Sequence, residues 1–263
     1  MNRAKIKSTL FEMLEDAGKV LKTAILKPKS IQKKSELSLV TATDKKCEEI
    51  IVRAIRKNFP SHAILTEESP PMGNSSCRWI IDPLDGTTNF AHTFPMACVS
   101  IAYEEDGKVQ TGGVFDPFRG ELFFAERGKG AFLNGKKIRV SSTARLNDSL
   151  ISTGFPYNRR EHLEDYLGIF KVFLMKTRDL RRTGSAAIDF CYVAAGRFEG
   201  YWEFNLMPWD KAAAMLILEE AGGTLTNLSG EPLTLEDNQN LISNGKIHGE
   251  MLKLARPFRH IAK

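Results

Sequence analysis

An apolar run followed by two aspartates limits the possible fold and function of this chain more than any other stretch. Residues 79–90 read Trp-Ile-Ile-Asp-Pro-Leu-Asp-Gly-Thr-Thr-Asn-Phe. The three apolar residues at the start predict a buried strand. Pro83 cannot donate a ladder hydrogen bond, which predicts that the strand stops at Asp82. Asp85 then follows on a chain that is already turning.

The residues after the strand favour a bound anion. Gly86 permits a left-handed or closely approached backbone, and Thr87 and Thr88 can begin a short helix whose free N–H groups point outward. Carboxylates hold hard divalent cations, and a nest of N–H groups holds an anion. The stretch therefore indicates a metal-bound phosphate. A simple Asp-capped turn uses the same residue types, so the rest of the chain has to decide.

Composition excludes several classes of protein. The 263 residues can form one large or two small domains, and 42% hydrophobic with 26% charged residues is ordinary for a soluble globular protein. The apolar runs fall short of the roughly 20 residues of a membrane helix, and the N-terminus lacks an apolar signal core, so we expect a cytoplasmic protein. A net charge of +5 agrees with an anionic substrate and does not require nucleic acid. The basic stretches 27–34 and 178–182 lack interleaved aromatic residues and are interpreted as solvated faces.

The cysteines and histidines limit the metal chemistry. Cys47, Cys77, Cys98 and Cys191 are far apart and form no Cys-x-x-Cys pair, which favours reduced thiols over zinc ligands or disulfides. The five histidines are not spaced like ligands. Any metal should therefore be bound by oxygen, as Mg²⁺, Mn²⁺ or Ca²⁺ is.

Hydrophobic periodicity predicts an α+β fold with layered sheets and helices. We expect helices over 3–26, from Thr43 or Asp44 to Phe59, over 162–176, 184–195 and 208–221, and from about Lys246. Strands are expected at 63–65, 79–81, 150–152, 198–202, 224–226 and 241–243, with an antiparallel meander between 96 and 140. The polar stretch 29–39 predicts a mobile loop. Two sub-domains, 1–145 and 146–263, should pack as one compact unit.

Acidic residues recur at the beginnings and ends of predicted elements. Glu67 follows the 63–65 strand, Asp44 begins the second helix, and Asp210 lies in the first turn of an alanine-rich helix. Taken singly, Asp44 and Asp210 are most simply helix caps, and Glu67 a surface residue. No spacing argument brings these separate segments together.

A family resemblance does bring them together. The stretches that carry it are Leu39–Asp44, Glu67–Ser69, Trp79–Phe90, Arg181–Ala187 with Glu203, and Trp209–Gly223. In order and spacing they resemble the lithium-sensitive, magnesium-dependent phosphatases of the inositol monophosphatase family. The segment from Arg181 to Glu203 looks like the bacterial inositol-1-monophosphatase branch, the SuhB type. The resemblance covers nearly the whole chain and implies a layered αβαβα sandwich of the inositol monophosphatase and fructose-1,6-bisphosphatase type.

The resemblance also implies the metal ligands. Glu67, Asp82 and the backbone carbonyl of Leu84 would hold one Mg²⁺. Asp82, Asp85 and Asp210 would hold a second, and Glu67 would contact a third through water. Mn²⁺ is a possible substitute. Each position of this chain carries the residue type that the family's pattern requires.

The remaining roles follow from the same resemblance. Thr87, supported by Asp44, would help Glu67 to orient and deprotonate the attacking water. The Gly86 and Thr87 N–H groups would bind phosphate oxygens. The substrate contacts implied by the resemblance are Asp85, Gly86, Thr87, Arg181, Gly184, Ser185, Ala186, Glu203 and Asp210.

These residue types suit phosphate monoester hydrolysis. The substrate is a dianion, and two cations roughly 3.5–4 Å apart can activate water and stabilise the leaving oxygen. A Ser, Cys or His nucleophile is not required. Cys191 is interpreted as a core residue and His92 as structural.

We therefore expect a Mg²⁺-dependent inositol-1-phosphate phosphatase that forms a homodimer. Fructose-1,6-bisphosphatase, 3′-phosphoadenosine-5′-phosphate phosphatase and histidinol-phosphatase are alternatives with the same metal site. A second class of function is contact with the transcription machinery in addition to catalysis, because some bacterial relatives have that role.

Overall fold

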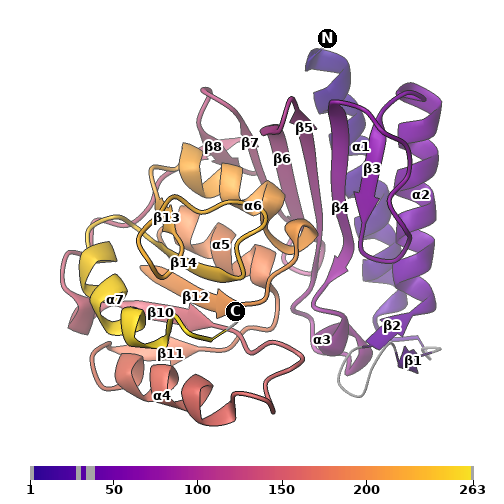
Figure 1. Cartoon of the computed structure of the whole chain (residues 1–263). Helices are drawn as coiled ribbons and strands as arrows, with labels where there is room; N and C mark the ends of the chain where they lie inside the picture. The colour runs from indigo at the N-terminus through magenta and orange to yellow at the C-terminus, as the bar shows by residue number, and fades with distance from the viewer. Residues whose placement is uncertain (1–2, 28–30, 34–38, 262–263) are drawn as a thin grey trace.

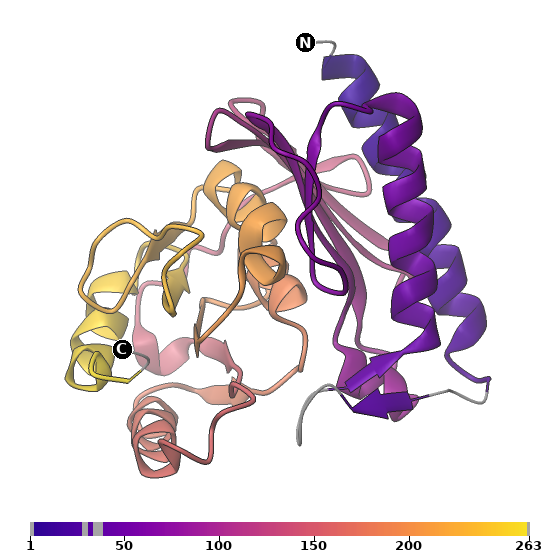
Figure 2. The same cartoon turned by 45° about the vertical axis from the view of Figure 1, so that its right-hand side comes forward.

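The computed structural model describes residues 3–27, 31–33 and 39–261 and consists of five layers (Figures 1 and 2). Helices α1 (Arg3–Ala24) and α2 (Ala42–Asn58) cover one face of a seven-stranded sheet. Helices α5 (Ala186–Ala194) and α6 (Pro208–Glu220) lie between that sheet and a second sheet of five strands. Helices α4 (Leu163–Leu174) and α7 (His248–Ala255) cover the outer face. This arrangement confirms the α+β class and the αβαβα layering.

The seven-stranded sheet follows the order of the chain. Its strands are β3 (Ala63–Thr66), β4 (Cys77–Asp85), β5 (Cys98–Glu105), β6 (Lys108–Asp116), β7 (Glu121–Glu126), β8 (Ala131–Leu133) and β9 (Lys136–Ile138). Strands β3 and β4 are parallel, and each later neighbour is antiparallel, so the predicted meander is confirmed. Along β4 the side chains alternate between two cores: Trp79 and Ile81 pack with α1 and α2, whereas Ile80 packs with α5 and α6.

The prediction that the 79–81 strand stops at Asp82 is wrong. Strand β4 continues to Asp85, with Asp82 opposite Ser100 and Asp85 opposite Cys98. Three steps along β4 thus match two steps along β5, which is a β-bulge. Pro83 lies within this irregular stretch, where a missing backbone N–H removes no ladder bond. The bulge brings both aspartates to the end of the same strand.

The second sheet has five strands and includes Glu203. It comprises β10 (Leu150–Thr153), β11 (Asp179–Arg181), β12 (Gly200–Phe204), β13 (Thr224–Thr226) and β14 (Gln239–Ser243), in the order β11-β10-β12-β14-β13. Strand β10 runs parallel to β11 and β12, and β14 runs antiparallel to β12 and β13. Tyr201 faces the inner core with α5 and α6, and its neighbour Trp202 faces α4 and α7.

Several sequence expectations differ from the observed elements. Periodicity missed β11, whose three residues include a single apolar one, and it gave no separate bounds for the short strands β8 and β9 at the end of the meander. Part of the loop expected over 29–39 lies outside the described residues; β1 (Ile31–Lys33) and β2 (Leu39–Thr41) form a short antiparallel pair. The division at residue 145 stays a prediction. In the described part of the chain, no helix is both long enough and apolar enough to cross a membrane.

Candidate active site

Strand β4 ends in two buried carboxylates. Asp82 is 1% exposed, and its Oδ1 accepts a hydrogen bond from the Leu84 N–H at 2.9 Å. Asp85 Oδ2 accepts hydrogen bonds from Ser185 Oγ at 2.6 Å and from the Ala187 N–H at 2.8 Å. Ser185 and Ala187 belong to the N-terminus of α5, where partial positive charge favours an anion. Asp85 therefore connects the first sheet with the element expected to face the substrate.

The turn after β4 requires a glycine. Gly86 has φ +94°, and a Cβ there would lie 2.8 Å from the Met96 carbonyl oxygen. This left-handed residue begins helix α3 (Thr87–Ala91). Thr87 Oγ1 lies 3.0 Å from Asp44 Oδ1 and 3.0 Å from the Leu84 carbonyl oxygen, so its single proton serves one of these two acceptors at a time. The structure thus brings Thr87 and Asp44 together, as the resemblance implied.

Asp44 has a structural and a site contact. It is the third residue of α2, and its Oδ2 accepts hydrogen bonds from the Thr41 N–H at 2.9 Å and from Thr41 Oγ1 at 2.5 Å. Burial raises its pKa, and the bonds from Thr41 and Thr87 oppose that rise. The cap role expected for a lone aspartate at this position and the contact with Thr87 are therefore both present.

Glu67 lies in the turn that follows β3, and a residue that the sequence analysis missed holds this turn. Glu48 of α2 accepts hydrogen bonds from Thr66 Oγ1 at 2.6 Å, from the Glu68 N–H at 3.1 Å and from Ser69 Oγ. The available signal was spacing: Glu48 lies four residues after Asp44, and therefore on the same helix face.

Asp210 is placed by helix α6. Its Oδ2 accepts a hydrogen bond from the Met207 N–H at 2.7 Å, and Pro208 occupies the first turn. The helix approaches strand β6 closely, because a Cβ on Gly112 would lie 2.7 Å from the Ala213 carbonyl oxygen. Small residues on both elements thus allow α6 to carry Asp210 to the first sheet.

Burial and neighbouring carboxylates raise the pKa values of all three aspartates. Burial is the main reason why the pKa of Asp82 and that of Asp210 are raised well above their usual range, and the neighbouring carboxylates raise both further. Burial and Glu67 raise the pKa of Asp85 to about 6, although its hydrogen bonds from Ser185 and Ala187 oppose the rise. Buried carboxylates whose charges repel one another need either protons or a cation.

The carboxylate oxygens of the three aspartates are of the type that binds a hard cation, although the side chains are not grouped closely enough to bind one as they stand. Within the described residues, no three acidic, histidine or cysteine side chains are grouped closely enough to hold a metal ion as they stand. One oxygen of each of Asp82, Asp85 and Asp210 accepts a backbone hydrogen bond, which leaves the second oxygen of each as a candidate ligand. An all-oxygen set with raised pKa values is the chemistry expected of a Mg²⁺ or Mn²⁺ site.

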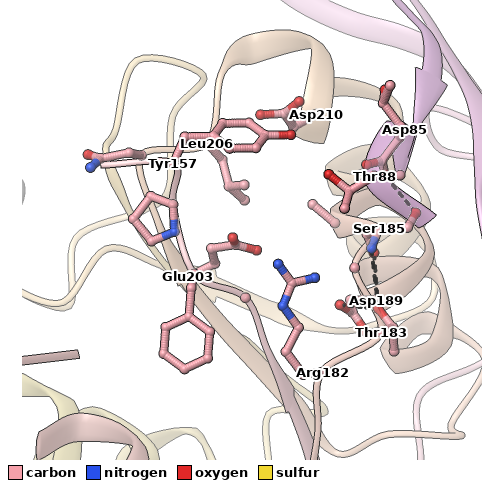
Figure 3. A pocket seen from close by; sticks show the side chains of 18 of the residues that line it. Asp85, Thr88, Tyr157, Arg182, Thr183, Ser185, Asp189, Glu203, Leu206 and Asp210 are labelled. Atoms are coloured by element: carbon pink, nitrogen blue, oxygen red, sulfur yellow. Dashed lines mark hydrogen bonds between the residues drawn. The ribbon is translucent and has the colours of Figure 1, made fainter. Parts of the chain in front are cut away.

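A cavity of about 930 Å³ opens beside these acids (Figure 3). Eight of the predicted site residues line it: Asp85, Gly86, Thr87, Gly184, Ser185, Ala186, Glu203 and Asp210. Asp44 and Asp82 are buried behind this lining, as is Leu84. Asp85 and Asp210 lie at one end of the cavity, and Glu203 and Arg182 face each other at the other end.

The structure places Arg182, rather than Arg181, in the lining. The Arg181 side chain is half exposed and pairs with Asp179, whereas the guanidinium of Arg182 points toward Glu203 (Figure 3). Consecutive residues of an extended chain point to opposite sides, so a shift of one residue exchanges the surface for the cavity. Asp189, four residues after Ser185 on α5, also lines the cavity, and sequence reasoning missed it.

Glu203 is a partly buried acid that accepts a hydrogen bond from the Tyr201 hydroxyl and faces Arg182. Burial raises its pKa to about 7, while a hydrogen bond from the Tyr201 hydroxyl and the charge of Arg182 oppose the rise. Gly154 leaves room for this carboxylate, because a Cβ at that position would overlap the Glu203 side chain.

Asn89, on α3, joins the two halves of the site and was also missed. Its Nδ2 donates hydrogen bonds to the Met96 carbonyl at 2.8 Å and to the Thr183 carbonyl at 2.9 Å. Gly184 next to Thr183 has φ +91°, and a Cβ there would lie 2.6 Å from Asn89 Nδ2. The side chain of Asn89 thus requires glycine at position 184.

Comparison with known proteins identifies the family. The model of the inositol monophosphatase family matches residues 2–259. The chain belongs to the inositol monophosphatase family. It is 46% identical over 229 residues to the inositol-1-monophosphatase of Synechocystis, covering 86% of this chain and 79% of that protein. It is 42% identical over 251 residues to the putative Nus factor SuhB of Neisseria meningitidis serogroup B, covering 94% of this chain and 96% of that protein.

A solved structure of the inositol monophosphatase family confirms the fold. The SuhB protein of Bartonella henselae superposes with a TM-score of 0.91 at 37% identity, over 95% of this chain and 97% of the other. Proteins of this family are generally metal-dependent phosphatases. The names of the relatives differ, some describing an inositol-1-monophosphatase and others a Nus factor, so family membership leaves the substrate to be determined.

Proposed function

We propose that this protein is a Mg²⁺-dependent phosphomonoesterase whose first candidate substrate is inositol-1-phosphate. The observation that carries the proposal is the placement of Asp85 and Asp210 at one end of a cavity of about 930 Å³, with Asp82 buried on the same strand as Asp85. Burial and neighbouring carboxylates raise the pKa values of all three, which supports a cation between them.

The proposed metal ligands are those that the family resemblance implies. Glu67, Asp82 and the Leu84 carbonyl would hold one cation, and Asp82, Asp85 and Asp210 a second, with a third reached from Glu67 through water. Mg²⁺ is the proposed metal and Mn²⁺ a substitute. Such cations supply charge neutralisation for the phosphate and a lowered pKa for water.

The residues on the β4 side would handle the nucleophile, which we propose is water. The Thr87 hydroxyl, whose proton can go to Asp44, can accept a hydrogen bond from that water and fix its orientation. Glu67 would take the proton as general base. The Gly86 and Thr87 N–H groups, at the start of α3, would hold phosphate oxygens in line for attack.

Other residues of the cavity lining would hold the alcohol part of the substrate. Gly184, Ser185 and Ala186 offer backbone groups, and Glu203 and Asp210 offer acceptors for hydroxyl protons. The volume of about 930 Å³ suits a small phosphorylated polyol. Fructose-1,6-bisphosphate, a nucleotide bisphosphate and histidinol phosphate remain alternatives because they would use the same metal site.

A phosphate-release screen tests the proposal. Inositol-1-phosphate and the three alternatives are offered to the purified protein with Mg²⁺, with chelator, and with Mg²⁺ restored. The expected result is metal-dependent release that is fastest for inositol-1-phosphate. Release that continues undiminished after exhaustive chelation would refute the metal mechanism, and faster release from another substrate would replace the first candidate.

Contact with the transcription machinery is a second candidate, favoured by relatives that are named Nus factors. A pull-down from bacterial lysate with wild type and with Asp85→Asn separates the two roles. Capture of transcription proteins by both forms would support a role independent of catalysis, and capture by neither form would argue against it.

A homodimer is also proposed, on the exposed face of α4. Leu163, Leu167 and Leu174 on this helix are each 46–47% exposed, and Met175 directly after it is 74% exposed. Contiguous apolar side chains of this kind mark interaction surfaces. Sedimentation of wild type against Leu167→Glu checks the assignment: a dimer that the charge dissociates supports it, and a wild-type monomer contradicts it.

A further inference from the structure

Glu48 has no role in the proposed reaction, yet its carboxylate accepts three hydrogen bonds from the turn that carries Glu67. We propose that Glu48 is a positioning residue, which fixes the backbone of residues 66–69 so that Glu67 faces the metal site. The inference rests on the proposed function, because that function assigns Glu67 as metal ligand and general base.

The contacts of Glu48 lie on both sides of Glu67. Its side chain is buried, with 7% of the residue exposed. Thr66 Oγ1, directly before Glu67, donates to Oε2 at 2.6 Å, and the Glu68 N–H, directly after it, donates to the same oxygen at 3.1 Å. Ser69 Oγ donates to Oε1. The residues that flank Glu67 in the chain are therefore tied to one carboxylate.

Burying this carboxylate costs free energy unless both of its oxygens are hydrogen-bonded. Both oxygens of Glu48 are occupied, and all three donors come from a single turn of four residues. Removing the carboxylate would leave the Glu68 N–H and two hydroxyls to find new partners. The turn would then relax, and the direction of the Glu67 side chain would change with it.

The same helix face supports the other residue that would orient the water. Asp44 lies one turn before Glu48 on α2, and it accepts the hydrogen bond of Thr87. Helix α2 thus supports Thr87 through Asp44 and Glu67 through Glu48. Side chains that orient metal ligands commonly change metal affinity when they are mutated, by about 10–100-fold.

Direct metal binding tests the inference without substrate. The full-length protein is titrated with Mn²⁺ as the probe, and free Mn²⁺ is followed by electron paramagnetic resonance. We expect Glu48→Ala to weaken Mn²⁺ binding by about tenfold or more. Glu48→Gln should retain most of the affinity, because its amide oxygen can accept from the turn and its NH₂ can donate to a hydroxyl.

Two control variants on the same helix separate positioning from general destabilisation. Glu49→Ala removes an exposed neighbour that pairs with Arg53, and it should leave Mn²⁺ binding unchanged. Ile51→Ala opens a cavity under α2, where Ile51 is fully buried, and should lower the melting temperature while the protein that remains folded binds Mn²⁺ with wild-type affinity. If Glu48→Ala does not fold, Thr66→Val combined with Ser69→Ala removes two of the three donors and replaces it in the titration.

The outcomes distinguish this inference from the proposed function. Wild-type Mn²⁺ affinity in folded Glu48→Ala, or an equal loss in Ile51→Ala, overturns the positioning role. If that occurs while the wild type still hydrolyses phosphate monoesters with Mg²⁺, only the role of Glu48 falls. A wild-type protein that neither binds Mn²⁺ nor releases phosphate overturns both.

Discussion

Replacing Glu203 by glutamine should stabilise the metal-free protein at neutral pH, and should have no such effect below pH 4.5. Burial raises the pKa of Glu203 to about 7 from an ordinary value of 4.5. Below pH 4.5 the carboxyl is protonated in the folded and unfolded states alike, so it adds no pH dependence there. Between these values the unfolded state releases the proton and the folded state keeps it. The free energy of unfolding therefore falls as the pH rises toward 7 and is constant above it.

The size of this effect follows from the pKa difference. At about 1.4 kcal/mol per pH unit, the ionised carboxylate lowers the free energy of unfolding by about 3 kcal/mol. Glutamine has nearly the same shape, and its amide oxygen can still accept the hydrogen bond from Tyr201. For a chain of 263 residues, 3 kcal/mol corresponds to about 5 °C in melting temperature.

The assay is thermal or urea unfolding in chelator, at several values between pH 4.5 and pH 8. We expect wild type and Glu203→Gln to have equal stability at the acid end and the variant to be more stable at pH 8. Tyr201→Phe is the matched control: it removes the hydrogen bond to the ionised carboxylate, and the wild-type loss of stability should become larger. Parallel profiles for wild type and Glu203→Gln, or a variant that is less stable at pH 8, would refute the electrostatic argument.

The remaining predictions concern the metal site and its turn. Chelation should abolish phosphate release and Mg²⁺ should restore it, as a colorimetric phosphate assay will show. Asp85→Asn and Asp210→Asn should each reduce turnover at least about 100-fold with an unchanged far-UV spectrum, because each removes a ligand charge; wild-type turnover at saturating Mg²⁺ would exclude that residue from the site. Gly86→Ala should lower the free energy of unfolding by more than about 1 kcal/mol, measured in urea, since φ is +94° and Met96 blocks a Cβ. Li⁺ should inhibit uncompetitively, because a monovalent ion can occupy carboxylate oxygens but stabilises a leaving oxygen poorly; relief by high substrate would contradict this order.

Local patterns were sufficient for most elements of the fold. Apolar residues at helical spacing predicted α1 and α2, because that spacing follows the buried face of a helix. Stretches rich in strand-forming residues predicted the meander. Strand β4 was predicted too short because Pro83 normally ends a ladder, and only pairing with β5 shows that a bulge accommodates it. Strand β11 was missed because Leu180 is the only apolar residue among its three, which leaves no apolar run to detect.

The site was predictable as a list of residues and not as an arrangement. Asp82 and Asp85 are close in sequence, and a turn after a strand indicates their proximity. Asp210 lies far along the chain, and no periodicity places it beside them, so only the family resemblance predicted its role. The choice of Arg181 over Arg182 shows the limit of such a transfer, since neighbouring residues on an extended chain face opposite sides. Glu48 was missed because its partners are defined by tertiary contact.

The candidate site combines residues of the first sheet with residues of the helical layer that separates the two sheets. Asp85 belongs to β4, but its hydrogen-bond donors Ser185 and Ala187 belong to α5, and Asn89 donates to the Thr183 carbonyl across the same boundary. Helix α6 carries Asp210 to the first sheet through its close contact with β6. The carboxylates that repel one another are thus held on separate elements whose packing is secured by the apolar layer between the sheets. Because that layer supplies the stability, the like charges can be kept together for a cation to join.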